Sequence, residues 1–176
     1  MNTLFISGSP RSGNTEFILN RIYKETKGQK ELVLLRKLDI KHCAGCLHCE
    51  THKKCSISDD MQKFYEKLPK ANLIVIGTPN YFDNVPGLLK DFIDRTNPLY
   101  DTGKLKSKKL IAIVTGGGKI KNSKRVADQA LRYFSEGYGL KTIGKYYFQA
   151  LHRDEIKKNP KALKLIDQIS KKINLL

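Results

Sequence analysis

Residues 3–15 have the sequence TLFISGSPRSGNT, in which a short apolar run passes directly into a loop of small polar residues. The run Thr3–Ser7 predicts a buried strand, and an amphipathic helix is predicted from about Asn14. Glycines in such a loop allow tight turns and a close approach of the backbone to a ligand. Hydroxyl groups, the charge of Arg11 and free N–H groups at the helix start make the loop a candidate anion site. It is not the nucleotide P-loop, because the Gly-Lys-Ser/Thr ending is absent.

The alternation of apolar strands with amphipathic helices continues along the chain. Further strands are expected at 31–36, 72–77, 110–115 and 143–148. Further helices are expected after a cap at Ser58, near Pro86, over 123–138 and from Asn159 and Pro160. This order predicts an α/β fold with a doubly wound, five-stranded parallel sheet and helices on both faces. We expect residues 1–176 to form a single domain.

Two more loops follow predicted strands and carry unusual residues. Parallel strands place every such loop at the carboxyl edge of the sheet, where ligands bind. The segment 78–87, TPNYFDNVPG, combines aromatic and amide side chains, and the segment 115–118, TGGG, ends a strand with three glycines. The three loops together predict one ligand site.

The first two loops carry a family resemblance. Gly8-Ser9-Pro10-Arg11 followed by Gly13-Asn14-Thr15 resembles the FMN phosphate loop of the NAD(P)H-dependent FMN reductase branch of the flavodoxin-like superfamily, and the segment 78–87 resembles its flavin-ring loop. The resemblance implies a flavodoxin-like fold and phosphate contacts from Ser7, Ser9, Arg11, Ser12, Asn14 and Thr15. It implies flavin-ring contacts from Pro79, Asn80, Tyr81, Phe82, Asp83, Asn84, Thr115 and Gly116.

All four cysteines lie in one short segment with the spacing Cys43-x2-Cys46-x2-Cys49-x5-Cys55. A disulfide framework is not distributed in this way, so a reducing compartment is indicated. Compact spacing lets one loop wrap a [4Fe–4S] cluster, which takes four thiolate ligands. Structural zinc sites more often use two Cys-x2-Cys pairs about a dozen or more residues apart.

The Cys-rich loop at 41–58 also resembles the cluster motif of the iron–sulfur flavoproteins, a subgroup of the same reductase family. That resemblance implies a [4Fe–4S] cluster held by Cys43, Cys46, Cys49 and Cys55. Zinc is an alternative, in which a histidine replaces a cysteine as ligand; the candidates are His42, His48 and His52. In a third alternative the loop holds no metal and contains free thiols or a Cys-x2-Cys disulfide.

The chain is strongly basic, with 33 Lys and Arg against 17 Asp and Glu and a net charge of +16. The basic residues are spread along the whole chain and no nucleic-acid motif surrounds them. This favours a solvated surface that attracts anionic partners, and we expect no nucleic-acid partner. No apolar run approaches the length of a membrane span and no signal peptide is visible, so we expect a cytoplasmic protein without a membrane partner.

These features predict an FMN-dependent oxidoreductase that moves electrons between reduced nicotinamide or ferredoxin, FMN and a [4Fe–4S] cluster. The flavin carries the chemistry, so no catalytic side chain is expected. The resemblance implies NAD(P)H as an electron donor, a small-molecule or protein redox partner, and a homodimer or homotetramer. Two alternatives are a cluster-free NAD(P)H-dependent FMN or quinone reductase and a basic nucleic-acid-binding module stapled by a metal.

Overall fold

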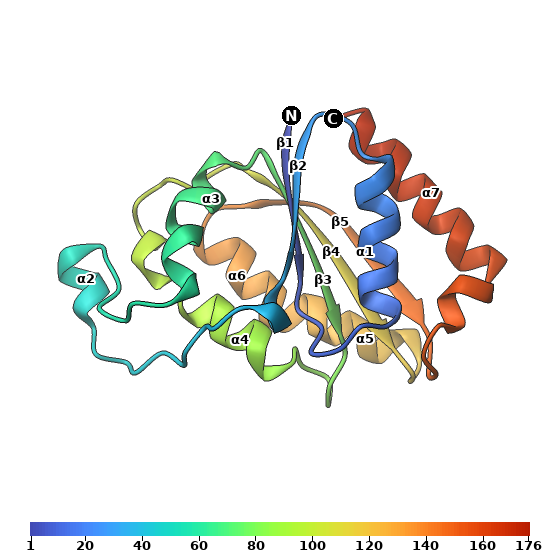
Figure 1. The fold of residues 1–176 in the computed structure, drawn as a ribbon, viewed down its shortest axis with the longest axis horizontal. Coiled ribbons are helices and arrows are strands. Elements are labelled where there is room, and N and C mark those ends of the chain that lie inside the picture. Colours follow the sequence, from blue (N-terminus) through green and yellow to red (C-terminus); the bar gives the residue numbers. More distant parts are fainter.

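The computed structural model describes residues 1–176 and contains a five-stranded parallel sheet (Figure 1). Its strands are β1 (Asn2–Ser7), β2 (Gln29–Leu34), β3 (Leu73–Pro79), β4 (Lys109–Gly116) and β5 (Lys141–Gln149). They lie in the order β2-β1-β3-β4-β5, and every adjacent pair is parallel. This is the flavodoxin-like order, in which the strand order reverses between β1 and β3. The predicted fold class is confirmed.

Helices cover both faces of the sheet (Figure 1). The helices α1 (Asn14–Glu25) and α7 (Pro160–Asn174) lie side by side on one face. The other face is covered by α3 (Phe64–Lys70), α4 (Gly87–Asp94), α5 (Ile120–Val126) and α6 (Arg132–Gly137). The short helix α2 (His48–His52) lies apart from both layers, at the outer end of the Cys-rich loop.

Alternation along the central strands builds one apolar core on each face of the sheet. Phe5 and Val75 pack with α1 and α7, whereas Ile6, Ile74 and Val114 pack toward the opposite helices. All five side chains are fully buried. Successive residues of a strand point to opposite faces, so an unbroken apolar run is what a strand covered on both sides requires.

Several element boundaries differ from the sequence prediction. The second strand ends at Leu34 because a 3₁₀ turn begins at Leu35. The cap expected at Ser58 is instead Asp59, whose carboxylate accepts the N–H of Met61 at 2.9 Å ahead of a 3₁₀ turn. The helix expected over 123–138 begins at Ile120 and contains a π-helical turn at 127–131. The last helix begins as predicted, with Asn159 as its cap.

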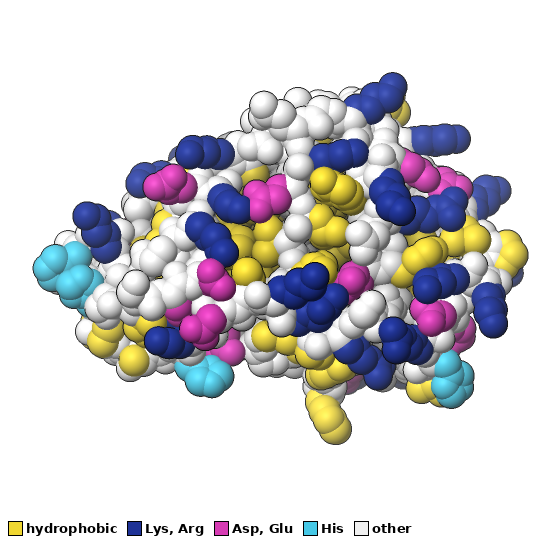
Figure 2. Space-filling view, in the orientation of Figure 1, with side chains coloured by type: hydrophobic (Ala, Val, Ile, Leu, Met, Phe, Trp, Pro, Cys, Tyr) yellow, Lys and Arg dark blue, Asp and Glu magenta, His cyan; other side chains and the backbone are white.

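The surface of the molecule carries its charge in a dispersed form. Figure 2 shows Lys and Arg side chains scattered across one face and mixed with carboxylates, over α1, α3 and α4 alike. Dispersed positive charge attracts anions over long distances without defining a single binding patch. None of the helices combines the length and the apolar character that crossing a bilayer requires.

Candidate functional site

A polar cavity of about 130 Å³ lies at the carboxyl edge of the sheet, where the strand order reverses. It is formed by the three loops that the sequence singled out and by a fourth segment that follows β5. Its lining residues are Ser9, Arg11, Gly13, Asn14, Thr15, Pro79, Asn80, Tyr81, Thr115, Gly116, Gly117, Ala150, Leu151 and Arg153. Residues that are distant in the sequence therefore meet at one place.

The start of α1 presents unused hydrogen-bond donors to this cavity. Gly13 is the N-cap residue, and no side chain caps the helix. The backbone N–H groups of Asn14, Thr15 and Glu16 donate to no protein acceptor. Gly13 has an extended backbone with a φ of −177°, so its contribution is space: an added Cβ would contact nothing within 4 Å. Open space in front of free N–H groups at a helix start has the geometry that an anion site requires.

Two hydrogen bonds hold the first loop against its neighbours. The hydroxyls of Thr15 and Thr115 are buried and lie 2.6 Å apart, which ties the start of α1 to the end of β4. Ser9 donates its hydroxyl to the carbonyl oxygen of Arg11 at 2.7 Å, which stabilises the turn of the loop. The Arg11 side chain itself is exposed. Arg11 thus brings a positive charge to the cavity from a loop whose backbone is held in place by these hydrogen bonds.

The Asn14 side chain has a role that the sequence did not predict. Its Nδ2 donates to the carbonyl oxygen of His152 at 2.8 Å, and its Oδ1 accepts the N–H of Ile156 at 3.3 Å. Both groups therefore help to hold the segment after β5 against the start of α1. Asn14 can still offer an anion its backbone N–H and the second N–H of its Nδ2.

The loop after β3 contributes Asn80, whose Oδ1 is buried and has no partner. Its Nδ2 donates to Asp83 at 3.3 Å, and its backbone N–H donates to the carbonyl oxygen of Thr115 at 2.7 Å. A buried acceptor without a partner is costly, so Oδ1 is suited to accept a hydrogen bond from a ligand.

The tip of the same loop points away from the cavity. Tyr81 and Asn84 exchange backbone hydrogen bonds of 2.9 and 3.0 Å, with Phe82 and Asp83 in left-handed conformations between them. Phe82 is fully exposed, and Asp83 pairs with Arg125 at 2.9 Å. The predicted ring residues Phe82, Asp83 and Asn84 do not line the cavity, whereas Pro79, Asn80 and Tyr81 do.

Gly116 at the end of β4 and Gly117 directly after it allow the walls of the cavity to meet. A Cβ at Gly116 would lie 2.8 Å from Ser123 Oγ and 3.2 Å from Asn80 Cβ. A Cβ at Gly117 would lie 2.6 Å from Cδ1 of Leu151. The 2.8 Å contact at Gly116 and the 2.6 Å contact at Gly117 are both shorter than a Cβ atom tolerates. The close approach of these loops therefore requires glycine at both positions.

The segment after β5 forms a wall that the sequence analysis missed, through Ala150, Leu151 and Arg153. The carboxylate of Glu155 accepts the backbone N–H groups of His152 and Leu151 at 3.0 and 2.8 Å, and these bonds hold the pKa of Glu155 below its usual range. The available signal was positional, because this segment also follows a parallel strand.

Two predicted phosphate residues lie outside the cavity lining. Ser7 is buried at the end of β1, and its Oγ has no hydrogen-bond partner. Ser12 lies in the first loop but does not line the cavity. Ser9, Arg11, Asn14 and Thr15 do line it. The free N–H groups of α1 and the Arg11 charge together fit the phosphate of a ligand such as FMN, and the unpartnered Asn80 acceptor fits a hydrogen-bond donor elsewhere on the same ligand.

The four cysteines do not converge. All are free; Cys43 and Cys46 are exposed, and Cys49 and Cys55 are partly buried. No three side chains of the kinds that bind metals lie close enough together to hold one ion. Four free thiols at close spacing nevertheless have the donor chemistry that a [4Fe–4S] cluster requires. The loop therefore fits a cluster by its chemistry and its spacing along the chain.

Polar neighbours surround the thiols of the loop. Asn97 donates its Nδ2 N–H to Cys49 Sγ at 3.0 Å. Cys46 Sγ lies 3.5 Å from the hydroxyl of Ser56, and hydrogen bonds from Ser56 and the backbone of His48 lower the pKa of the Cys46 thiol. Donors to sulfur favour the thiolate form, which is the form that binds metals.

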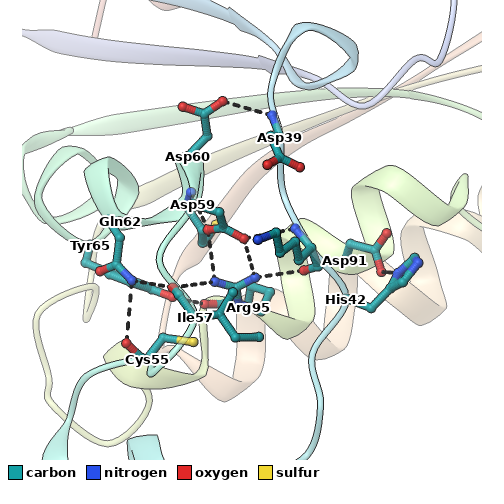
Figure 3. Close-up of polar contacts among 12 residues, drawn as sticks. Asp39, His42, Cys55, Ile57, Asp59, Asp60, Gln62, Tyr65, Asp91 and Arg95 are labelled. Atoms are coloured by element: carbon teal, nitrogen blue, oxygen red, sulfur yellow. Dashed lines mark hydrogen bonds and ion pairs between the residues drawn. The ribbon is translucent and has the colours of Figure 1, made fainter.

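A buried ion pair lies at the base of the loop (Figure 3). The guanidinium of Arg95 donates to both carboxylate oxygens of Asp59 at 2.7 and 3.0 Å. Burial alone would raise the pKa of Asp59, but the bonds from Arg95 and from the backbone N–H groups of Lys41 and Met61 hold that pKa below its usual value. Asp59 is therefore a carboxylate at neutral pH.

A larger groove of about 540 Å³ lies next to the Cys-rich loop, away from the polar cavity. Its lining includes Cys43 and Gly45 from the loop and the aromatic side chains of Tyr100, Tyr133 and Phe134. The larger cavity is thus the more apolar one, and the smaller cavity holds the anion-binding groups. The chemistry of the lining, rather than the size of the cavity, makes the smaller cavity the candidate phosphate site.

Comparison with known proteins gives three results. A sequence profile of the family described as NADPH-dependent FMN reductase matches residues 1–153. An iron-sulfur flavoprotein of Archaeoglobus fulgidus is 40% identical over 121 residues, which cover 66% of this chain and 60% of that protein. An iron-sulfur flavoprotein of Methanocaldococcus jannaschii is 32% identical over 139 residues, which cover 76% and 72%. The chain thus spans about 60% of the length of the Archaeoglobus relative.

Solved structures support the fold. An NAD(P)H:quinone oxidoreductase from Methanothermobacter marburgensis matches with a TM-score of 0.77 and 14% identity, over 99% of this chain and 96% of that chain. A flavone reductase matches with a TM-score of 0.76 and 22% identity, over 99% of this chain and 62% of that chain. At these identities the likeness concerns the arrangement of the sheet and helices.

Proposed function

The chain belongs to the NADPH-dependent FMN reductase family, and from this premise we propose that it binds FMN non-covalently and moves electrons from a reduced nicotinamide donor to an acceptor. We further propose that residues 1–176 form one FMN-binding domain and that the acceptor is a small molecule or a redox protein. The chain spans only part of the Archaeoglobus relative. The proposed activity is therefore argued from the candidate site of this chain and not from the activity of that relative.

The observation that carries the proposal is the convergence of anion-binding groups on one cavity. The free N–H groups of Asn14 and Thr15 and the guanidinium of Arg11 come from one loop. They lie at the point of the sheet where flavodoxin-like proteins bind their ligand. A phosphate can accept hydrogen bonds from the N–H groups at the start of α1 and pair with the charge of Arg11 at the same time, which a neutral ligand cannot do.

When bound, FMN supplies the electron and hydride chemistry, and the protein contributes binding, orientation and electrostatics. Arg11 and the start of α1 hold the phosphate end. Asn80 offers its Oδ1 to the rest of the ligand, and Thr115 and Gly116 form the opposite wall. Phe82, Asp83 and Asn84 keep their ring assignment from the family likeness alone. We expect no catalytic side chain, because the flavin carries the chemistry.

We also propose that the Cys-rich loop holds a [4Fe–4S] cluster through Cys43, Cys46, Cys49 and Cys55. The support is the donor chemistry of four free thiols and the similarity to relatives in Archaeoglobus fulgidus and Methanocaldococcus jannaschii that are named iron-sulfur flavoproteins. The cluster would supply one-electron transfer. The part of the chain's own residues is to ligate it.

The test is the visible spectrum of protein purified without oxygen, with flavin, iron and sulfide assayed on the same sample. The proposal predicts about one FMN and about four irons per chain, and bleaching of the flavin bands when NADPH is added. Flavin without iron would remove the cluster and leave a cluster-free reductase. A sample that takes up no FMN would overturn the proposal as a whole.

A further inference from the structure

We propose that Arg95 is the positioning residue of the Cys-rich loop: it fixes both ends of the loop at one point and offers its remaining N–H to a sulfur ligand there. The inference rests on the proposed cluster role of the loop. It assigns a function to a buried side chain that does not line the FMN cavity.

The burial of Arg95 requires an explanation. Its side chain is 1% exposed, and it follows the last turn of α4. Arginine is almost never fully buried unless it is paired, because removing the charge from water is costly. Here the pairing partner is the fully buried Asp59, on the segment that follows the last cysteine. The pair therefore connects α4 to the Cys-rich loop.

The guanidinium reaches both ends of the loop at the same time (Figure 3). Nη1 donates to the carbonyl oxygen of Lys41 at 2.8 Å, just before the first cysteine. Nη2 donates to the carbonyl oxygen of Ile57 at 3.3 Å, just after the last one. The backbone N–H of Lys41 also donates to Asp59 at 2.9 Å. One side chain thus closes the base of the segment that contains all four thiols.

One donor of Arg95 is unused. Its Nε is buried and has no hydrogen-bond partner, although each other nitrogen of the guanidinium donates to two acceptors. Leaving a buried donor unpaired is costly, and a native structure rarely keeps one without a reason. An acceptor that arrives with a bound group would satisfy it.

The candidate acceptor for this N–H is the sulfur of Cys55, which is one of the proposed cluster ligands. Figure 3 shows Cys55, Tyr65 and Ile57 around Arg95. Tyr65 donates its hydroxyl to the Arg95 carbonyl at 2.9 Å, which fixes the backbone of Arg95 in this group. Cys55 therefore belongs to the group of residues around a guanidinium that has a free N–H.

The rest of the loop depends on this base. Residues 39–47 form no regular structure, and the thiols of Cys43 and Cys46 are exposed. Partners outside the ligand set orient metal ligands, and hydrogen bonds to cluster sulfurs tune the reduction potential. Arg95 is placed to do both, since it holds the loop ends and retains one donor.

The decisive variant is Arg95→Lys, with Arg21→Lys as the matched control. Lysine keeps the positive charge but has no Nε–H and no planar fork that can join Lys41, Ile57 and Asp59. Arg21 also donates two N–H groups to one carboxylate, at Asp167, but it lies on α1 away from the loop. Both variants are purified without oxygen, and flavin, iron and sulfide are assayed on each.

We expect Arg95→Lys to retain FMN, to release iron to a chelator about tenfold faster than the unmodified protein, and to shift the potential of the cluster to a more negative value. Arg21→Lys should match the unmodified protein in all three. Iron release and potential that are unchanged in Arg95→Lys would overturn the proposal. If Arg95→Lys does not fold, Arg95→Met with Asp59→Leu removes both charges together and is tested in the same way.

Amide hydrogen exchange separates this inference from the cluster proposal. If the unmodified protein holds no iron, the cluster proposal fails, and the exchange of residues 41–59 then tests the anchor by itself. Faster exchange in this segment for Arg95→Lys, with unchanged exchange in α1, would support the anchoring role without a cluster. Equal exchange in both proteins would overturn it.

Discussion

The two candidate cofactor sites differ in how far the fold itself assembles them. At the cavity, Thr15 and Thr115 are already in contact, and glycines let the walls meet. In the Cys-rich loop, the base is closed by Arg95 and Asp59, but the four thiols remain apart. A site built from strand ends is formed by the sheet, whereas a ligand loop gains its final arrangement from the group it binds. The evidence for the first site is its geometry, and the evidence for the second is the chemistry of its four thiols.

The largest effect is expected from Cys49→Ser, which breaks one site and spares the other. Loss of one of four thiolate ligands should remove nearly all iron, because a cubane cluster needs each of its ligands. FMN content should not change, since Cys49 does not line the polar cavity. Iron, sulfide and flavin per chain measure both sites, and Thr51→Ser in the same loop is the control. Joint loss of iron and FMN would show that the sites are not independent.

A second large effect is expected at the base of the loop, from Asp59→Asn. The variant leaves the buried Arg95 without a negative partner, which should lower the free energy of unfolding by about 3–5 kcal/mol. The neighbouring Asp60 pairs with Lys63 at 2.9 Å on the surface, so Asp60→Asn should lower the free energy of unfolding far less than Asp59→Asn. Urea unfolding at pH 7 measures both. Equal losses of unfolding free energy in the two variants would mean that the buried pair stabilises the protein no more than the surface pair does.

The same carboxylate gives the base a pH dependence with a definite sign. The pKa of Asp59 is lower in the folded protein than the ordinary value of about 3.9. Its stabilisation is therefore complete above that value and is lost as the pH falls through the folded pKa. Below about pH 4, the free energy of unfolding should decrease more steeply with falling pH in the unmodified protein than in Asp59→Asn. Parallel curves would contradict the assignment.

At the cavity, Arg11→Ala should weaken FMN binding and leave iron unchanged. A hydrogen bond to a charged group contributes about 1.5–3 kcal/mol, which corresponds to roughly ten- to a hundredfold in affinity. Riboflavin has no phosphate, so its binding should be the same in both proteins. Fluorescence titration with the two flavins measures the difference, and Arg21→Ala is the control. Equal loss for both flavins would place Arg11 away from the phosphate.

The smallest effect is expected from Gly117→Ala, which tests the preformed walls of the cavity. The added methyl would lie 2.6 Å from Leu151, and such overpacking costs about 1–3 kcal/mol. Gly118→Ala is a matched control, because its Cβ would lie 3.5 Å from Asn122. FMN affinity should fall about tenfold in the first variant only. Equal affinities would mean that the walls adapt to the ligand.

The sequence predicted the sheet and most of the cavity because both follow from local patterns. Apolar runs such as Ile74–Ile76 identify strands, and parallel strands bring their following loops to one edge. The cap at Asp59 was missed because its partner Arg95 is distant in the sequence, and the ion pair selects the carboxylate over Ser58. Tertiary contacts of this kind override local capping preferences.

The wall after β5 was missed for a related reason. Leu151 contacts Gly117 only because β5 lies beside β4, and nothing in its own sequence marks it as a ligand residue. Asn14 was predicted from the resemblance to contact phosphate, and that stays a prediction; its side chain also holds the same wall through His152 and Ile156. The phosphate and ring assignments of the remaining residues stay predictions until a ligand is bound.

The central claim is that the cavity at the strand ends binds a flavin by its phosphate. Its most direct test is the affinity of the flavin-free protein for FMN and for riboflavin, measured side by side by fluorescence quenching. The account predicts that FMN binds at least about tenfold more tightly, because only FMN satisfies Arg11 and the start of α1. Equal affinities, or no binding of either flavin, would contradict it.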